Sequence, residues 1–127
     1  MHSSCVTSET LRSTDCDCVQ QMEGSIKKIS QAGNGIFFYL IQEGRGCGYI
    51  GKSRGCMLSQ FYELTSTPMN TFEAYKSLGM INDYRDYRNV RDICKILHID
   101  ESKFVLLTNN PDKIGGFKEL GLNLLRI

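Results

Sequence analysis

The chain carries almost no net charge, and it lacks both a long apolar run and a leader-like start. Its 127 residues include 15 Lys and Arg against 14 Asp and Glu, which gives a formal net charge of +1. A net charge this small creates no strong electrostatic field around the protein, so general binding to nucleic acid or to an anionic membrane is not expected. The longest apolar run, Ile36 to Ile41, is far shorter than the roughly 20 residues that cross a bilayer. We therefore expect a small-molecule partner, with no nucleic acid and no membrane.

The first ten residues, MHSSCVTSET, do not show the basic and apolar pattern of a secretory signal. The six cysteines are unevenly spaced, so reduced thiols are favoured over a disulfide framework. We expect a cytoplasmic protein. A chain of 127 residues with 41% apolar content is expected to form one domain, residues 1–127, around one core.

Apolar residues at helical spacing predict a helix from Val19 to about Ala32, which ends at the left-handed residues of Gly33-Asn34-Gly35. Similar patterns predict three further helices, from Ile50 to a break at Leu64–Pro68, from Phe72 to Leu78 with Thr71 as N-cap, and from Val90 to Leu97. His98 is expected to cap the last of these helices rather than to bind a ligand. Cys94 lies on the apolar side of that helix and is expected in the core.

Two apolar runs predict strands. Ile36–Ile41 is continuous and bounded by glycines, which is typical of a central strand buried on both faces. A second buried strand, Phe104–Thr108, precedes a helix near Ile114–Leu120 and an edge strand at Asn123–Ile127, so this region is expected to form a βαβ unit. The predicted fold class is α/β, a mixed sheet with buried central strands flanked by helices.

Three cysteines stand close together near the start, in CVTSETLRSTDCDC. If Cys16 and Cys18 lie on a strand, both sulfurs point to one side with Cα atoms about 6.5–7 Å apart, and Cys5 can curl in as a third zinc ligand. His2 could close the site as a structural Cys₃His centre, or the fourth position could stay open for catalysis. A site without metal is the third possibility. The spacing alone leaves these alternatives open.

Two loops are candidates for anion binding. Gln42–Gly48 combines glycines, which let backbone N–H groups approach an anion, with Arg45, whose planar fork matches phosphate oxygens. Thr108 and Lys113 lie between a strand end and a helix start, a common phosphate position. A flexible turn with a solvated ion pair is the alternative for the first loop. The charged stretch Met80–Arg88 is compatible with a solvated helix entrance.

Four stretches, CVTSETLRSTDCDC followed by Gln21, QEGRGCG, NDYRDYRN and LLTNNPDKI, occur in the order found in the GTP cyclohydrolase II family, which the chain resembles over nearly its whole length. The resemblance implies that zinc on Cys5, Cys16 and Cys18 activates a water that attacks C8 of GTP, with release of formate and pyrophosphate on the way to riboflavin. It implies Mg²⁺ with the triphosphate and a homodimer.

The resemblance also implies roles for individual residues. Asp83 corresponds to the proton acceptor and Arg85 to the proposed nucleophile, although a protonated guanidinium is better suited to electrostatic stabilisation. Cys56 stands at a catalytic position. The expected substrate-binding residues are Gln21, Glu43, Gly44, Arg45, Arg54, Thr71, Thr108 and Lys113.

Several features depart from the family pattern. Cys56 replaces a tyrosine near the reacting base, which predicts slower formate release because a thiol is shorter and a weaker donor than a phenol. Ser4 replaces a glutamate, residues 62–69 lengthen a loop, and the family's leading strands are expected to be missing. A non-catalytic nucleotide-binding paralogue and a structural-zinc interaction module therefore remain alternatives to the enzyme.

Overall fold

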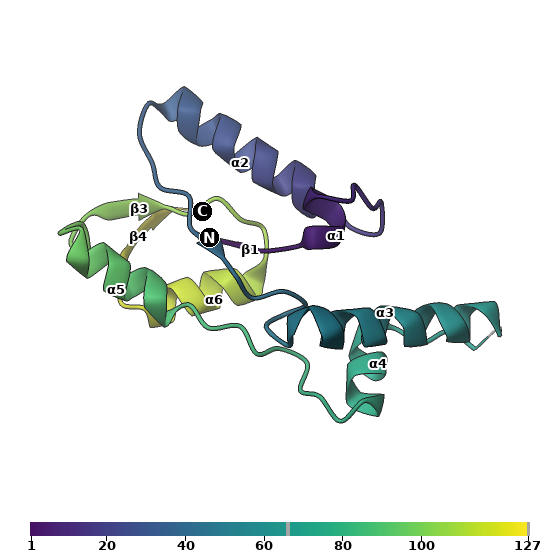
Figure 1. The fold of residues 1–127 in the computed structure, drawn as a ribbon. Helices are drawn as coiled ribbons and strands as arrows, with labels where there is room; N and C mark the ends of the chain where they lie inside the picture. Colours follow the sequence, from purple (N-terminus) through teal and green to yellow (C-terminus); the bar gives the residue numbers. More distant parts are fainter. Residues whose placement is uncertain (66, 127) are drawn as a thin grey trace. The chain divides into compact units, whose positions relative to one another are not determined.

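The computed structural model describes residues 1–65 and 67–126, which contain six helices and four short strands (Figure 1). They form two compact units. The first comprises Met1, Glu23–Phe38 and the chain from Asp86 on, and the second comprises His2–Met22 and Tyr39–Arg85. All three cysteines of the CVTSETLRSTDCDC stretch belong to the second unit.

The second unit begins with a short parallel strand pair. β1 (His2–Ser3) pairs with β2 (Tyr39–Leu40), and α1 (Val6–Glu9) follows β1 directly. The chain after β2 turns through the glycine loop into α3 (Gly48–Leu64). The loop thereby joins a strand end to a helix start, as the sequence predicted.

Helix α4 (Thr71–Ser77) packs against α3 through a glycine. A Cβ at Gly55 would lie 2.5 Å from the Tyr75 ring, and Tyr75 is only 3% exposed. The absence of a side chain at position 55 is therefore what allows the tyrosine ring to lie on α3. This contact orders the α3–α4 pair beside the glycine loop.

The predicted N-cap of α4 is wrong by one residue. Asn70, not Thr71, accepts a hydrogen bond from the Glu73 backbone N–H at 3.0 Å, and the Glu73 carboxylate accepts from the Asn70 N–H at 2.9 Å. Both residue types suit a cap, but only Asn70 has an acid three residues later to complete the capping box. Thr71 is instead the first helical residue.

The first unit contains the predicted βαβ arrangement. β3 (Lys103–Val105) and β4 (Asn123–Arg126) pair in parallel, and α6 (Pro111–Glu119) connects them. Phe104 and Phe117 meet edge to face with centroids 5.9 Å apart. The βαβ prediction is confirmed, although Val105 is 44% exposed and the strand is less buried than predicted.

Two further helices of this region also match their predictions. α2 (Cys18–Ala32) starts in the second unit and ends at Gly33, whose φ is 77°. α5 (Arg88–Ile96) buries Cys94, which is 1% exposed, so its core position is confirmed. After α5, His98 has φ 55°, and the N–H groups of His98 and Ile99 bond back to the carbonyls of Lys95 and Cys94. His98 thus occupies the left-handed C-terminal cap position.

The predicted central strand is wrong. Only Tyr39–Leu40 is strand, Tyr39 is 42% exposed, and Ile41 is 84% exposed. An apolar run shows that a segment can form a strand, but the presence of neighbours on both sides depends on the rest of the chain. The described strands form two separate parallel pairs rather than one mixed sheet with buried central strands. The α/β content itself is as predicted.

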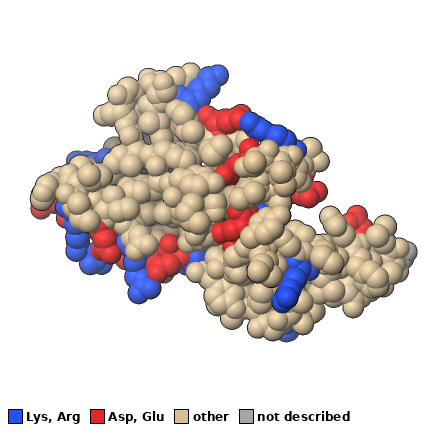
Figure 2. All heavy atoms as spheres, viewed as in Figure 1, with Lys and Arg blue, Asp and Glu red and all other residues tan. Residues whose placement is uncertain are grey.

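Ser66, which falls within the predicted break at Leu64–Pro68, and Ile127, the predicted end of the last strand, lie outside the described residues. In the parts of the chain that are described, no helix has the length and apolar content to span a membrane. On the face drawn in Figure 2, acidic and basic side chains are interspersed among uncharged ones.

Candidate functional site

The three cysteines converge as the sequence predicted. Cys5 precedes α1, Cys18 begins α2, and the loop between the two helices brings in Cys16. Their sulfurs all lie within 4.8 Å of one another, and those of Cys5 and Cys16 are 3.6 Å apart. A tetrahedral zinc with Zn–S bonds of about 2.3 Å needs sulfurs about 3.8 Å apart. The donor set and its spacing therefore fit zinc.

His2 is engaged away from the thiols. Its Nε2 lies 2.6 Å from Glu9 Oε1, and its ring stacks on Tyr39 with centroids 5.9 Å apart. Within the described residues, the only metal-capable cluster of at least three His, Cys, Asp or Glu side chains consists of Cys5, Cys16 and Cys18. This geometry favours an open fourth position over a Cys₃His centre.

Glu9, which the sequence analysis did not single out, holds the segment that carries the first thiol. Its Oε1 accepts from the Cys5 backbone N–H at 3.0 Å, and its Oε2 accepts from the Tyr39 hydroxyl at 2.5 Å. Burial raises the pKa of Glu9, but the bonds from Tyr39 and His2 outweigh it and hold the pKa below its usual range. The bond to Glu9 raises the pKa of Tyr39 to about 12. An ionised Glu9 thus joins β1, α1 and β2.

Lys52 is the second residue that sequence reasoning missed. From the first turns of α3, its Nζ donates to Glu43 Oε1 at 2.5 Å, to Thr7 Oγ1 at 3.0 Å and to Cys5 Sγ at 3.1 Å. Burial lowers the pKa of Lys52, but the bonds to Glu43 and Cys5 outweigh it and raise the pKa. The ammonium is therefore a permanent cation at the edge of the thiol cluster. The sequence feature that could have identified Lys52 is its position shortly after the glycine loop.

The thiols themselves differ in electrostatic environment. Burial raises the pKa of Cys5, but the bond from Lys52 and others outweigh it, so the pKa is lowered overall. Burial and the neighbouring Cys16 raise the pKa of Cys18. Cys5 is thus more ready than Cys18 to bind a metal as thiolate.

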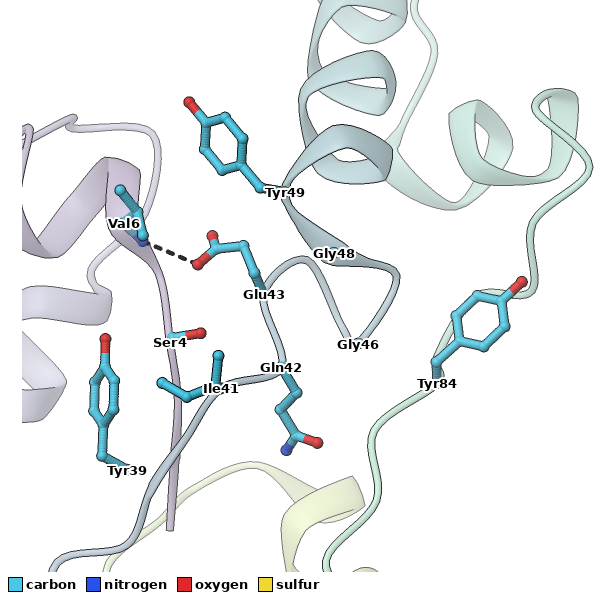
Figure 3. Close-up of a pocket in the computed structure, with 10 residues that line it drawn as sticks. All are labelled: Ser4, Val6, Tyr39, Ile41, Gln42, Glu43, Gly46, Gly48, Tyr49 and Tyr84. Atoms are coloured by element: carbon cyan, nitrogen blue, oxygen red, sulfur yellow. Dashed lines mark hydrogen bonds between the residues drawn. The ribbon is translucent and has the colours of Figure 1, made fainter.

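The glycine loop contributes Glu43, which points toward α1 (Figure 3). Its Oε2 accepts from the Val6 backbone N–H at 3.1 Å, and the residue is 8% exposed. The loop turns through positive φ angles at Gly44, Arg45 and Gly46 of 60°, 58° and 84°. A Cβ at Gly46 would lie 2.8 Å from the Tyr84 backbone carbon. Glycine is therefore required there for the approach of the Tyr84 segment.

A pocket of about 550 Å³ lies against this loop. Its walls come from the β1–α1 segment, from β2 and the glycine loop, and from two tyrosines, Tyr49 and Tyr84 (Figure 3). Ser4 lines it together with Glu43. The pocket is large enough for a nucleotide-sized ligand.

The Asp83–Arg85 pair is attached to the same loop. The Tyr84 N–H donates to the Arg45 carbonyl at 2.7 Å. Arg85 Nε donates to both Asp83 carboxylate oxygens at 2.9 Å, and Nη2 adds a third bond. Burial raises the pKa of Asp83, but these bonds outweigh it and lower the pKa. The two predicted catalytic residues therefore form one local ion pair beside Arg45, in the segment that leads into α5. Asp83 is exposed, so this geometry also agrees with the alternative of a solvated helix entrance with local ion pairs.

Four other predicted site residues, which are Gln21, Arg45, Arg54 and Thr71, lie on α2, the glycine loop, α3 and α4. Arg45 lies over the Phe72 ring at 4.1 Å from its centroid. Gln21 is exposed on α2, where its Nε2 donates to Asp17 Oδ1 at 2.8 Å. Arg54 and Thr71 are exposed on α3 and α4. None of these four is engaged with the cysteine cluster in the contacts that the structure describes.

Cys56 lies one helical turn after Lys52 on α3, so the two share a face of the helix. Burial raises its pKa, and the charges that act on it come from Lys52, Asp15, Cys5 and Cys16. Cys56 is therefore a neutral thiol within electrostatic reach of the cluster.

Thr108 and Lys113 belong to the first unit. The Thr108 hydroxyl accepts from the Asn110 backbone N–H at 3.1 Å, and Lys113 lies in the first turn of α6 behind the Asn110 cap. Both are half-buried at the strand-to-helix connection, as predicted.

A thiol cluster that could hold a metal, beside a glycine loop and an acid–base pair on α/β elements, makes this a candidate metal-binding protein. Residues 1–126 match the model of the family described as GTP cyclohydrolase II. GTP cyclohydrolase-2 of Aliivibrio fischeri strain MJ11 is 42% identical over 124 residues, which cover 98% of this chain and 58% of the relative. A Neisseria meningitidis serogroup A relative of the same name is 42% identical over 125 residues, or 98% of this chain and 59% of that protein.

This chain belongs to the GTP cyclohydrolase II family, so the predicted resemblance is confirmed. It spans a little over half the length of these curated relatives.

Proposed function

We propose that the protein is a zinc-dependent GTP cyclohydrolase II, which opens the guanine imidazole ring at C8 and releases formate and pyrophosphate to give the pyrimidine precursor of riboflavin. The observation that carries this proposal is the convergence of Cys5, Cys16 and Cys18 at zinc-compatible spacing in a chain of this family. The same unit also supplies the glycine loop and the Asp83–Arg85 pair.

Cys5, Cys16 and Cys18 would hold the zinc, leaving its fourth position open. Bound there, zinc supplies the Lewis acidity that activates a water for attack on the guanine. Three thiolates offset the dication to a formal charge of −1, which weakens that activation compared with a neutral-ligand site. Nearby cations are therefore needed, and Lys52 lies 3.1 Å from Cys5 Sγ.

Asp83 and Arg85 have complementary roles. The Asp83 carboxylate is proposed as the proton acceptor. The bonds from Arg85 lower its pKa and so weaken it as a base. Its basicity would rise when substrate phosphate draws Arg85 away. Arg85 stays protonated, and its role is to stabilise charge on the α-phosphate as pyrophosphate leaves. The bidentate contact with Asp83 holds the guanidinium until substrate phosphate competes for it.

The remaining proposed contacts concern the rest of GTP. Gln21 reads the guanine, Gly44 and Arg45 approach the phosphates, and Mg²⁺ accompanies the triphosphate. Arg54, Thr71, Thr108 and Lys113 complete the proposed set of contacts. We place the protein in the cytoplasm as a homodimer forming one domain per chain.

Cys56 sets the outcome of the second hydrolysis. Because it stands where the family has a tyrosine and is a neutral thiol, it donates hydrogen bonds poorly. Formate release is therefore expected to lag behind ring opening, and the formylated pyrimidine accumulates.

The test is incubation of zinc-loaded protein with GTP and Mg²⁺, with mass spectrometry of the pyrimidine product and quantification of formate and pyrophosphate. We expect pyrophosphate in excess of formate, and the Cys56→Tyr variant should bring the two toward equal amounts. Equal amounts from the unmodified chain would overturn the role of Cys56 but confirm the enzyme.

A non-catalytic nucleotide-binding protein is the second candidate, favoured by Cys56 at the tyrosine position and Ser4 at the glutamate position. GTP binding by calorimetry without any product would establish it. A structural-zinc module is distinguished by His2→Ala, because only that function requires His2 as a ligand. The contact of His2 with Glu9 leads us to expect full zinc occupancy in this variant.

A further inference from the structure

The contacts of Lys52 give it a more specific role than that of a surface cation. Its side chain is 16% exposed, and its ammonium contacts three acceptors from two different segments. Cys5 and Thr7 belong to the β1–α1 segment, whereas Glu43 belongs to the glycine loop. An ammonium has three N–H donors and no acceptor, so these contacts engage its full hydrogen-bonding capacity.

Glu43 aims and restrains this ammonium. The Glu43 side chain is 9% exposed, and its second oxygen is held by the Val6 backbone N–H at 3.1 Å. A carboxylate fixed at both oxygens leaves Lys52 little freedom to turn away. The third donor is therefore directed at the Cys5 sulfur, which is 3.6 Å from Cys16 Sγ.

We propose that Lys52 is a positioning residue of the metal centre, which donates a hydrogen bond to the Cys5 sulfur and serves as the counter-charge of the zinc-loaded, three-thiolate site. This inference rests on the proposed zinc site. With zinc bound, the site has a formal charge of −1, and a hydrogen bond to a ligating sulfur withdraws charge from it and orients it. Such outer contacts are typically worth 10–100-fold in metal affinity.

The arrangement also explains why Glu43 is buried beside thiolates. Alone, a buried carboxylate there would repel the thiolates and remain uncompensated. Lys52 neutralises it and connects the glycine loop to the metal-binding segment.

The test compares Lys52→Met, which keeps most of the length of the side chain but removes the donor and the charge, with Lys52→Arg and with the unmodified chain. Lys76→Met is the matched control, because Lys76 is exposed on α4 in the same unit. Zn²⁺ affinity is measured by competition with a chromogenic chelator. Co²⁺ replaces Zn²⁺ in parallel, and the sulfur-to-cobalt charge-transfer band is recorded.

We expect Lys52→Met to bind Zn²⁺ 10–100-fold more weakly and to shift the cobalt band to longer wavelength, because a sulfur without its hydrogen bond is easier to oxidise. Lys52→Arg should retain most of both properties, and Lys76→Met should change neither. If Lys52→Met leaves Glu43 too unfavourable for folding, the Lys52→Met, Glu43→Gln double variant removes that carboxylate and is measured instead.

Wild-type affinity and an unshifted band in Lys52→Met would overturn the inference. Weaker binding with an unshifted band would also overturn it, since the effect would then not act through the sulfur. Failure of the unmodified chain to bind Zn²⁺ would instead overturn the proposed function, so the two failures are distinguishable.

Discussion

At the scale of single residues, the site depends on acidic side chains that are held by hydrogen bonds from specific donors. Glu9, Glu43 and Asp83 are each held by a specific donor, namely the Tyr39 hydroxyl, the Lys52 ammonium and the Arg85 guanidinium. Of these acids, the sequence pointed to Glu43 and Asp83 through motifs, and it did not point to Glu9. The donors to Glu9 and Glu43 lie farther along the chain, at separations of 30 and 9 positions, and the fold brings them close. The donor to Asp83 is only two residues away in the sequence.

Replacing Arg85 by Met should raise the pKa of the Asp83 carboxyl toward its usual value. The bonds from Arg85 currently outweigh burial and hold that pKa low. A lowered folded-state pKa contributes stability above the unfolded value of about 3.9, and this contribution is lost as the pH falls through the folded pKa. Carboxyl carbon shifts of Asp83, followed by NMR from neutral to acidic pH, measure the change.

The matched control for that experiment is Arg88→Met, which removes the neighbouring pair with Asp86 and leaves the Asp83 contacts in place. A pKa of Asp83 that is equally low in Arg85→Met would show that the ion pair does not control it. The remaining donors, such as the Arg85 backbone N–H, would then have to account for the shift.

At the scale of elements, helices followed their sequence patterns more closely than strands did. A helix satisfies its backbone hydrogen bonds internally, so α2, α3 and α5 could be located from apolar spacing, caps and glycines. A strand needs partners from elsewhere in the chain. For this reason, the sequence of Ile36–Ile41 predicts a central strand, whereas only Tyr39 and Leu40 of this segment form the strand β2.

Replacing Asn70 by Ala should lower the free energy of unfolding by about 1 kcal/mol, the usual cost of losing a helix cap. Asn70 both accepts from the Glu73 N–H and donates its own N–H to the Glu73 carboxylate, and the variant removes the first of these bonds. Urea denaturation followed by circular dichroism measures the change.

Asn70→Ser keeps a capping oxygen and should retain most of the stability. Equal losses in Asn70→Ala and Asn70→Ser would mean that the side-chain oxygen is not what stabilises the start of α4. Since Tyr75 of α4 packs on Gly55 of α3, a frayed α4 should also increase the exposure of that ring, which tyrosine fluorescence can report.

At the scale of the whole molecule, the predicted site residues are distributed unevenly between the two units. The thiols, the glycine loop, Lys52 and the Asp83–Arg85 pair all belong to one compact unit, whereas Thr108 and Lys113 belong to the other with the βαβ arrangement. A metal bound by Cys5, Cys16 and Cys18 would therefore act directly on one unit.

Removal of zinc by a chelator should increase amide hydrogen exchange in His2–Met22 and Tyr39–Arg85 more than in β3, α6 and β4. Metal binding adds to the stability of the structure that holds it, by about 2.7 kcal/mol when free zinc is 100 times its dissociation constant. Hydrogen exchange with mass spectrometry resolves the two units, and re-addition of Zn²⁺ should restore protection. Uniform loss of protection over the whole chain would contradict this prediction.

By itself, the sequence determined the family, the approximate positions of five of the six described helices and the three thiols as candidate metal ligands, because ordered motifs and local spacing are properties of the linear chain. The tertiary structure decided the rest of the centre. Glu9 reaches Tyr39 across 30 positions, and Lys52 reaches Cys5 across 47. Such contacts follow from how distant segments pack, and no local pattern of residues encodes them.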